Sequence, residues 1–191
     1  MSAETPTEIE ETEQIAQGLR AGANGADLAM LNRLVERYQG RLVRYLVHLL
    51  GRREHVEDLV QETWLRVLER GRQYDSRLRF EPWLFAIARN LALDLLRRKP
   101  LPICDTCESP ASPDPSPFEA TAKTEEAARL ARSLAALEPL SREALLLRFQ
   151  EEMSLLEIAR VVQAPVSTVS SRIYRGLAAL RTQLEKEEHE N

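Results

Sequence analysis

The sequence predicts an all-α protein made of two small helical domains that are joined by an extended, proline-rich linker. Only seven of the 191 residues are Gly, and Leu, Ala, Arg and Glu dominate, which favours helices over sheets. Apolar residues recur at helical spacing on both sides of residues 100–118, whose six prolines exclude a helix. We therefore expect an acidic disordered tail (1–13), a first domain (14–99), a linker (100–122) and a second domain (123–191).

The first domain is predicted to be a bundle of about four helices. A short helix is expected from about Thr12, with Ile15 and Leu19 facing inward, before the glycine-containing stretch at 18–25. A long helix follows from about Asp27, a plausible cap, and ends at Gly51. Its apolar stripe comprises Leu28, Leu31, Leu34, Val35, Tyr38, Leu42, Tyr45, Leu46 and Leu49.

Two amphipathic helices complete this domain between residues 55 and 99. The hinge between them, residues 72–80, is polar, aromatic and basic, and the second helix ends in a basic run at 97–99. A basic helix end near aromatic rings suits a protein that holds a phosphate backbone and unpaired bases. The alternative is an ordinary bundle with a solvated basic end. Phe80 and Trp83 continue the buried spacing, so we expect them in the core.

The second domain reads as a helix-turn-helix. After Leu130, Leu134 and Leu137, Pro139 breaks the chain and Ser141 is expected to cap the next helix. Residues 154–157 form a capping-box pattern that starts a short helix. The turn at 163–165 leads into a final helix with inward Val169, Ile173, Leu177, Leu180 and Leu184.

The charge distribution is uneven, although the net charge is −4. Residues 14–99 carry sixteen Lys and Arg against ten Asp and Glu, whereas 1–13 and 100–122 carry acids and no Lys or Arg. The first domain is therefore basic, as a nucleic-acid partner requires. The sequence has neither a run long enough to span a membrane nor a signal pattern, so we expect a cytoplasmic protein without direct membrane insertion.

No catalytic arrangement is apparent, so the sequence predicts a protein that is not an enzyme and needs no cofactor or metal. The three histidines are far apart, and there is no glycine-rich phosphate loop. The only cysteines, Cys104 and Cys107, cannot support a disulfide framework. Their spacing suits half a zinc site or a redox pair, and the alternative is two incidental thiols.

An ordered series of motifs in the first domain resembles the promoter-melting domain of bacterial sigma-70-family factors, most closely those of the extracytoplasmic-function (ECF) type. The second domain resembles the upstream-element-binding domain of the same family. The first series comprises Glu57–Thr63, Tyr74-Asp75, Pro82–Leu84, Ala88–Asn90, Asp94 and Arg97-Arg98. The second comprises Leu137, Pro139, Arg142-Glu143, Leu147–Phe149, Glu157–Ala159, Pro165, Thr168-Val169, Ser171-Arg172, Arg175 and Leu180-Arg181.

The resemblance implies a factor that joins core RNA polymerase, recognises the minus-thirty-five and minus-ten elements of promoter DNA, and helps to open the duplex. It also implies an anti-sigma factor, in some cases membrane-anchored, as a partner. The implied polymerase-binding residues are Asp58, Gln61, Glu62, Leu65 and Arg66, with a solvated helix face as the alternative. The implied minus-ten and melting residues are Tyr74, Arg77, Arg79, Asn90, Asp94, Arg97, Arg98 and Lys99. The implied minus-thirty-five residues are Ser167, Thr168, Ser170, Ser171, Arg172 and Arg175.

Three positions near the last helix depart from the family pattern. Ser167 and Gln163 stand where the family has Gly, and Ser170 replaces a basic residue. The acidic linker resembles the family segment that lies toward the RNA exit path, and the alternative is a passive tether. Two other functions stay open at this stage. One is a helix-turn-helix regulator that acts without polymerase, and the other is an interaction protein that mimics a sigma factor.

Overall fold

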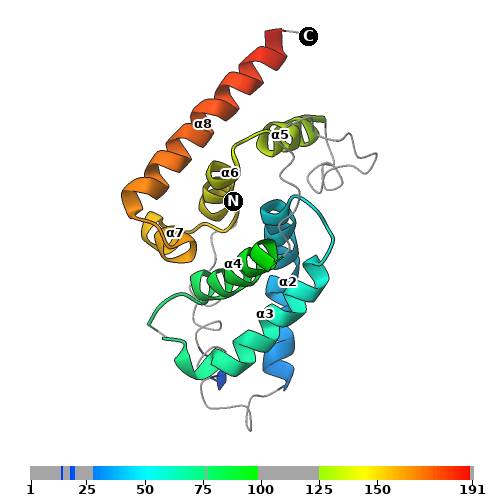
Figure 1. Cartoon of the computed structure of the whole chain (residues 1–191), viewed down its shortest axis with the longest axis vertical. Helices are drawn as coiled ribbons and strands as arrows, with labels where there is room; N and C mark the ends of the chain where they lie inside the picture. Colours follow the sequence, from blue (N-terminus) through cyan, green and yellow to red (C-terminus); the bar gives the residue numbers. More distant parts are fainter. Residues whose placement is uncertain (1–13, 15–17, 20–27, 76, 99–124, 190–191) are drawn as a thin grey trace. The chain divides into compact units, whose positions relative to one another are not determined.

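The structure, a computed structural model, describes residues 14, 18–19, 28–75, 77–98 and 125–189. This part of the chain forms helices and no strand, which confirms the predicted all-α class. The chain divides into two compact units between Leu95 and Leu96, and each is described here by itself. In the first, α2 (Leu28–Leu50), α3 (Val56–Arg70), the 3-10 turn η1 (Gly71–Gln73) and α4 (Phe80–Arg98) follow in order, and the boundary falls in the last turn of α4 (Figure 1).

Helix α2 packs along α3, and aromatic side chains connect it to α4. The apolar positions predicted from spacing form this core, because residues three and four apart share one helix face. Tyr45 of α2 meets Phe85 of α4 edge-on, with ring centroids 5.1 Å apart. The buried side chains include Leu34, Leu42, Leu46, Val56, Leu59, Val60, Trp64, Val67, Leu84, Ile87 and Ala88.

A short N-terminal piece packs where α3 meets η1. Residues 14, 18 and 19 are helical, and Leu19 is buried as predicted, whereas Ile15 lies outside the described residues. A Cβ atom on Gly71 would stand 2.8 Å from the carbonyl oxygen of Leu19. Because backbone cannot retreat as a flexible side chain can, this contact requires glycine at position 71.

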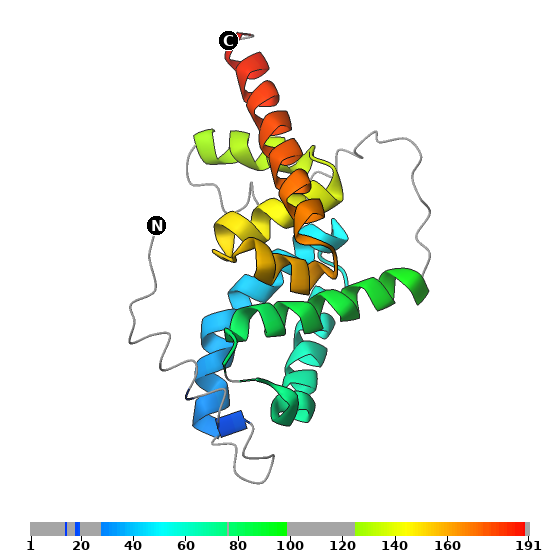
Figure 2. The same ribbon diagram turned by 90° about the vertical axis from the view of Figure 1, so that its left-hand side faces the viewer.

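The second unit is built around α8 (Val166–His189). Helices α5 (Glu125–Ala135), α6 (Pro139–Leu145) and α7 (Leu155–Val162) all contact it, and α8 runs past α6 and α7 toward the C-terminus (Figures 1 and 2). The π-helical turn η2 (Leu146–Gln150) continues α6. Its buried apolar residues are Leu137, Ala144, Leu145, Leu146, Leu147, Met153, Ile158, Ala159, Val161, Val162 and Val169.

The start of α6 differs from the prediction. Ser141 is not the cap, because α6 begins two residues earlier, at Pro139. The carboxylate of Glu138 accepts hydrogen bonds from the backbone N–H groups of Leu140 and Ser141, at 3.1 and 3.0 Å. Proline suits the first position of a helix because its missing N–H would lack an intrahelical partner there anyway.

The capping box at the start of α7 is confirmed. The N–H of Glu157 donates to Oγ of Ser154 over 3.3 Å, and the N–H of Ser154 donates to Oε2 of Glu157 over 2.7 Å. At the other end of α7, Gln163 takes the left-handed conformation, with φ 53° and ψ 47°. The turn between α7 and α8 therefore forms without the family's glycine, at the cost of strain at Gln163.

Replacing Gln163 with Gly is expected to raise the free energy of unfolding of the second unit by about 0.5–1 kcal/mol. The left-handed conformation costs an L-residue roughly 1–2 kcal/mol, and the greater freedom of unfolded glycine offsets part of that gain. Urea denaturation followed by circular dichroism measures the change. Gln150→Gly is the control, since Gln150 has a negative φ within η2 and glycine should destabilise it. Equal destabilisation by both variants would contradict the expectation.

Candidate nucleic-acid and protein interfaces

One face of α3 is open to solvent and carries all five predicted partner-binding residues. Their spacing of three and four places Asp58, Gln61, Glu62, Leu65 and Arg66 together, opposite the buried apolar stripe. The side chain of Asp58 is 83% exposed and Leu65 is 54% exposed. Arg66 pairs with Glu62 at 2.9 Å and with Glu69 at 3.0 Å. An exposed leucine among polar groups is typical of a surface that binds a separable protein.

The hinge between α3 and α4 is held by an aromatic cluster, and this corrects the prediction for Tyr74. Only 2% of Tyr74 is exposed, so its ring is not on a DNA-binding surface. Its centroid lies 5.6 Å from that of Phe80 and 5.2 Å from that of Trp83. Phe80 is buried, as expected, and Trp83 is partly exposed. Tyr74 is therefore a structural anchor whose hydroxyl donates to the carbonyl of Leu78.

A tight turn after Tyr74 presents the exposed part of the hinge. The carboxylate of Asp75 accepts from the backbone N–H of Arg77 at 3.1 Å, and the carbonyl of Asp75 accepts from the N–H of Leu78 at 2.9 Å. The side chain of Arg77 is 89% exposed, and Nε of Arg79 lies 3.5 Å from Glu81. Leu78 is 43% exposed, which sequence reasoning missed because an isolated leucine gives no signal of exposure.

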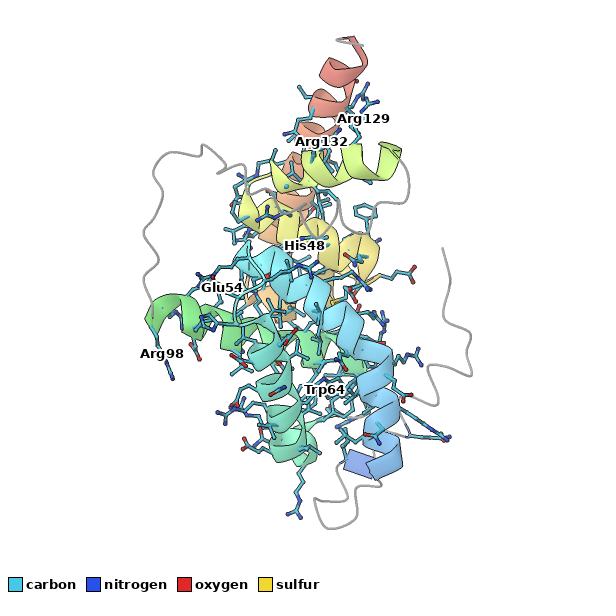
Figure 3. All side chains as sticks on the ribbon, turned by 90° about the vertical axis from the view of Figure 1, so that its right-hand side faces the viewer. His48, Glu54, Trp64, Arg98, Arg129 and Arg132 are labelled. Carbon is cyan, nitrogen blue, oxygen red and sulfur yellow. The ribbon has the colours of Figure 1, made fainter. Side chains whose placement is uncertain are left out.

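The C-terminal half of α4 offers a second exposed surface. Asn90, Asp94, Arg97 and Arg98 are all exposed and recur at helical spacing. Figure 3 shows Arg98 at the end of α4, with its side chain extending away from the ribbon. The remaining predicted residue, Lys99, lies outside the described residues. This surface is polar and basic, as a phosphate backbone requires.

In the second unit, the first turns of α8 carry the solvent-exposed face of the helix-turn-helix. Ser167, Ser170, Ser171 and Arg175 are exposed, whereas Thr168 and Arg172 are half-buried. Since α8 begins at Val166, Ser167 lies in the first turn and not at the cap position. The hydroxyl of Ser171 donates to the carbonyl of Ser167 over 2.9 Å.

Tyr174 belongs to the same open face and was missed by sequence reasoning. Its side chain is 76% exposed, four residues after Ser170 and next to Arg175. The four-residue spacing was the signal that could have identified it, because residues four apart lie on one face of a helix. An exposed tyrosine beside an arginine can contact both bases and the sugar-phosphate backbone of DNA.

Arg172 is partly engaged within the protein. Burial acts to raise the pKa of Glu138, but hydrogen bonds from Leu140 and Ser141 and the charge of Arg172 together lower that pKa below its ordinary value. Arg172 of α8 therefore interacts electrostatically with the cap of α6. It can support the packing of these two helices as well as bind an external anion.

An apolar groove opens on another side of the second unit. It has a volume of about 340 Å³, and its walls come from α5, α6, η2 and α8. Phe149, Leu130 and Leu177, which line it, are exposed. An exposed apolar groove of this kind is a mark of protein–protein contact.

Other kinds of site find no support within the described part of the chain. No group of three or more His, Cys, Asp or Glu residues there could hold a metal ion. Cys104 and Cys107 lie outside the described residues. Among the helices that the structure describes, none is long and apolar enough to cross a membrane.

Comparison with known proteins identifies relatives of both units. Residues 34–100 match the family model for sigma-70 region 2, and residues 127–180 match that for sigma-70 region 4. The chain is 35% identical over 176 residues to the ECF RNA polymerase sigma factor SigE of Mycolicibacterium smegmatis, covering 88% of this chain and 67% of that protein. It is 28% identical over 162 residues to the ECF RNA polymerase sigma factor SigW of Bacillus subtilis, covering 79% and 87%.

Two solved structures share the helical fold. CnrH, solved in complex with the cytosolic domain of CnrY, has a TM-score of 0.63 and 26% identity, with 92% of this chain and 98% of that chain covered. The sigma factor RpoE of Bartonella quintana, solved with the anti-sigma factor NepR, has a TM-score of 0.62, with 81% and 96% covered. Its identity of 20% supports the likeness in fold alone.

Proposed function

The chain belongs to the ECF sigma factors of the sigma-70 family, and we propose that it joins core RNA polymerase and directs it to promoters with two conserved elements. The observation that carries this proposal is the presence of both family regions in their usual order. Each of them keeps an exposed polar or basic face beside its buried core.

The surfaces divide this work among them. The α3 face from Asp58 to Arg66 would bind the polymerase, because it combines an exposed leucine with reversible ion pairs. The hinge turn, with Arg77 and Arg79, would hold an unpaired base and its backbone in the opened minus-ten element. The exposed end of α4 would contact the adjoining DNA, and the start of α8 would enter the major groove of the minus-thirty-five element.

The chemistry of RNA synthesis stays with the polymerase in this proposal, so the protein acts by binding and not as an enzyme. It would work in the cytoplasm, where its DNA lies. Family membership also predicts an anti-sigma factor that holds the protein inactive.

Run-off transcription tests the proposal. Core polymerase supplemented with this protein is expected to start RNA at defined positions on a subset of genomic promoter fragments, and core polymerase alone is not. Binding of the fragments without initiation would instead favour a regulator that acts without polymerase. A sigma mimic would instead suppress initiation that depends on another sigma factor added to the reaction, and it would give no new start sites.

A further inference from the structure

The start of the chain meets the hinge of the first unit at a close backbone contact. Leu19, in the short N-terminal helical piece, is only 5% exposed. It lies against Gly71, the first residue of η1: a Cβ atom at position 71 would stand 2.8 Å from the carbonyl oxygen of Leu19 and 3.2 Å from its Cβ. The two segments therefore pack backbone against backbone, and a single methyl group at position 71 would push them apart.

Gly71 is connected to the hinge turn through Tyr74. The backbone N–H of Tyr74 donates to the carbonyl of Gly71 over 3.2 Å, which closes η1. The hydroxyl of the same residue donates to the carbonyl of Leu78, at the other end of the turn. One tyrosine therefore joins both ends of this segment, because its backbone is fixed by η1 and its side chain holds Leu78.

The packing around Tyr74 leaves little room to absorb a displacement of η1. Tyr74 is 2% exposed, and its ring contacts those of Phe80 and Trp83, with centroids 5.6 and 5.2 Å away. Close-packed rings transmit a shift because the interior holds no space to take it up. A movement at Gly71 is therefore expected to reach the hinge turn, which presents the exposed side chains of Arg77 and Leu78.

We propose that Leu19 and Gly71 are positioning residues for the recognition of the minus-ten element. Their contact would set the position of η1 and, through Tyr74, the orientation of the hinge turn against the unpaired base. This inference rests on the proposed function, because the base is unpaired only in an opened promoter. It gives a part in DNA recognition to Leu19, which lies before the residues that match the region 2 family model, 34–100.

The test measures how well the protein distinguishes bases in a single strand. Holoenzyme is titrated with two fluorescent oligonucleotides, one with the minus-ten element of a promoter found by run-off transcription and one with the bases of that element replaced. The ratio of the two affinities reports the position of the hinge turn. Gly71→Ala is expected to lower this ratio by about threefold to tenfold, as is typical of a residue that acts through others. Loss of folded protein alone would reduce binding of both oligonucleotides in proportion and leave the ratio unchanged.

Leu19→Asp is the second variant, and it keeps the test decisive if Gly71→Ala folds poorly. A carboxylate at this buried position is expected to detach the N-terminal piece, because burial of an unpaired charge is unfavourable. The same fall in the ratio should follow. In the double variant Leu19→Asp, Gly71→Ala, the alanine should have no further effect, since the backbone that its Cβ would meet has moved away.

Gly40→Ala is the matched control. Gly40 is exposed in α2, and the nearest atom to a Cβ there would be Nη1 of Arg44, at an ordinary contact distance of 3.5 Å. This variant should keep the wild-type ratio.

An unchanged ratio in Gly71→Ala or in Leu19→Asp would overturn the inference, as would an equal loss in Gly40→Ala. Independent losses that add in the double variant would also overturn it, because Gly71 would then act apart from Leu19. Failure of wild-type holoenzyme to distinguish the two oligonucleotides would instead overturn the proposed function itself.

Discussion

Lysine in place of Asp58 is expected to weaken the binding of core polymerase by about 100-fold. Asp58 is almost fully exposed, and its one described ion pair is a 3.8 Å contact with His55. The substitution therefore changes the polymerase-binding face of α3 more than the hydrophobic core of the first unit. Like charges brought together in an interface cost several kcal/mol, and 100-fold corresponds to about 2.7 kcal/mol. Titration of labelled protein with core polymerase measures the loss.

Glu57→Lys separates this effect from damage to the helix. Both acids lie in the first turn of α3, so each lysine loses the same favourable interaction with the helix dipole, about 0.3–1 kcal/mol. Glu57 lies one position earlier, about 100° around the helix and at the edge of the proposed face. It should bind polymerase with nearly wild-type affinity. Equal weakening in both variants would mean that the loss comes from the helix and not from contact with the polymerase.

Much of the fold followed from local sequence patterns. The apolar spacing identified α2, α3 and α4, and the Ser154–Glu157 capping box located the start of α7. Such signals are local because helix periodicity and capping involve residues only three or four apart. The start of α6 was misplaced because two local rules competed there. Ser141 resembled a cap, whereas Pro139 at the first helical position is the arrangement that forms.

The errors at the candidate site arose in the hinge between α3 and α4, where contacts do not follow the regular spacing of a helix. An aromatic residue in a basic hinge looks like a stacking platform, but Tyr74 is buried against Phe80 and Trp83. Exposure of Leu78 likewise depends on the turn that Asp75 organises.

Alanine in place of Arg172 is expected to weaken binding to the minus-thirty-five duplex by about 1–3 kcal/mol. Since Ser170 replaces the family's basic residue, Arg172 and Arg175 supply most of the positive charge near the start of α8. Part of the loss should be indirect, because Arg172 is half-buried and interacts with Glu138 at the cap of α6. Arg172→Ala is therefore expected to lower the melting temperature as well. Fluorescence anisotropy and thermal melting measure the two effects.

Arg175→Ala provides the comparison that separates these contributions. Arg175 is exposed. The one hydrogen bond described for its side chain is donated by Nε to the carbonyl of Ser171 in the same helix, over 3.4 Å. Its removal is expected to weaken DNA binding without lowering the melting temperature. If either arginine reads a base, its replacement should no longer weaken binding to duplexes that are mutated in the minus-thirty-five element. If it contacts a phosphate, its replacement should weaken binding equally on every sequence. Full DNA affinity in both variants would contradict the placement of α8 in the major groove, because little other positive charge lies near the start of this helix.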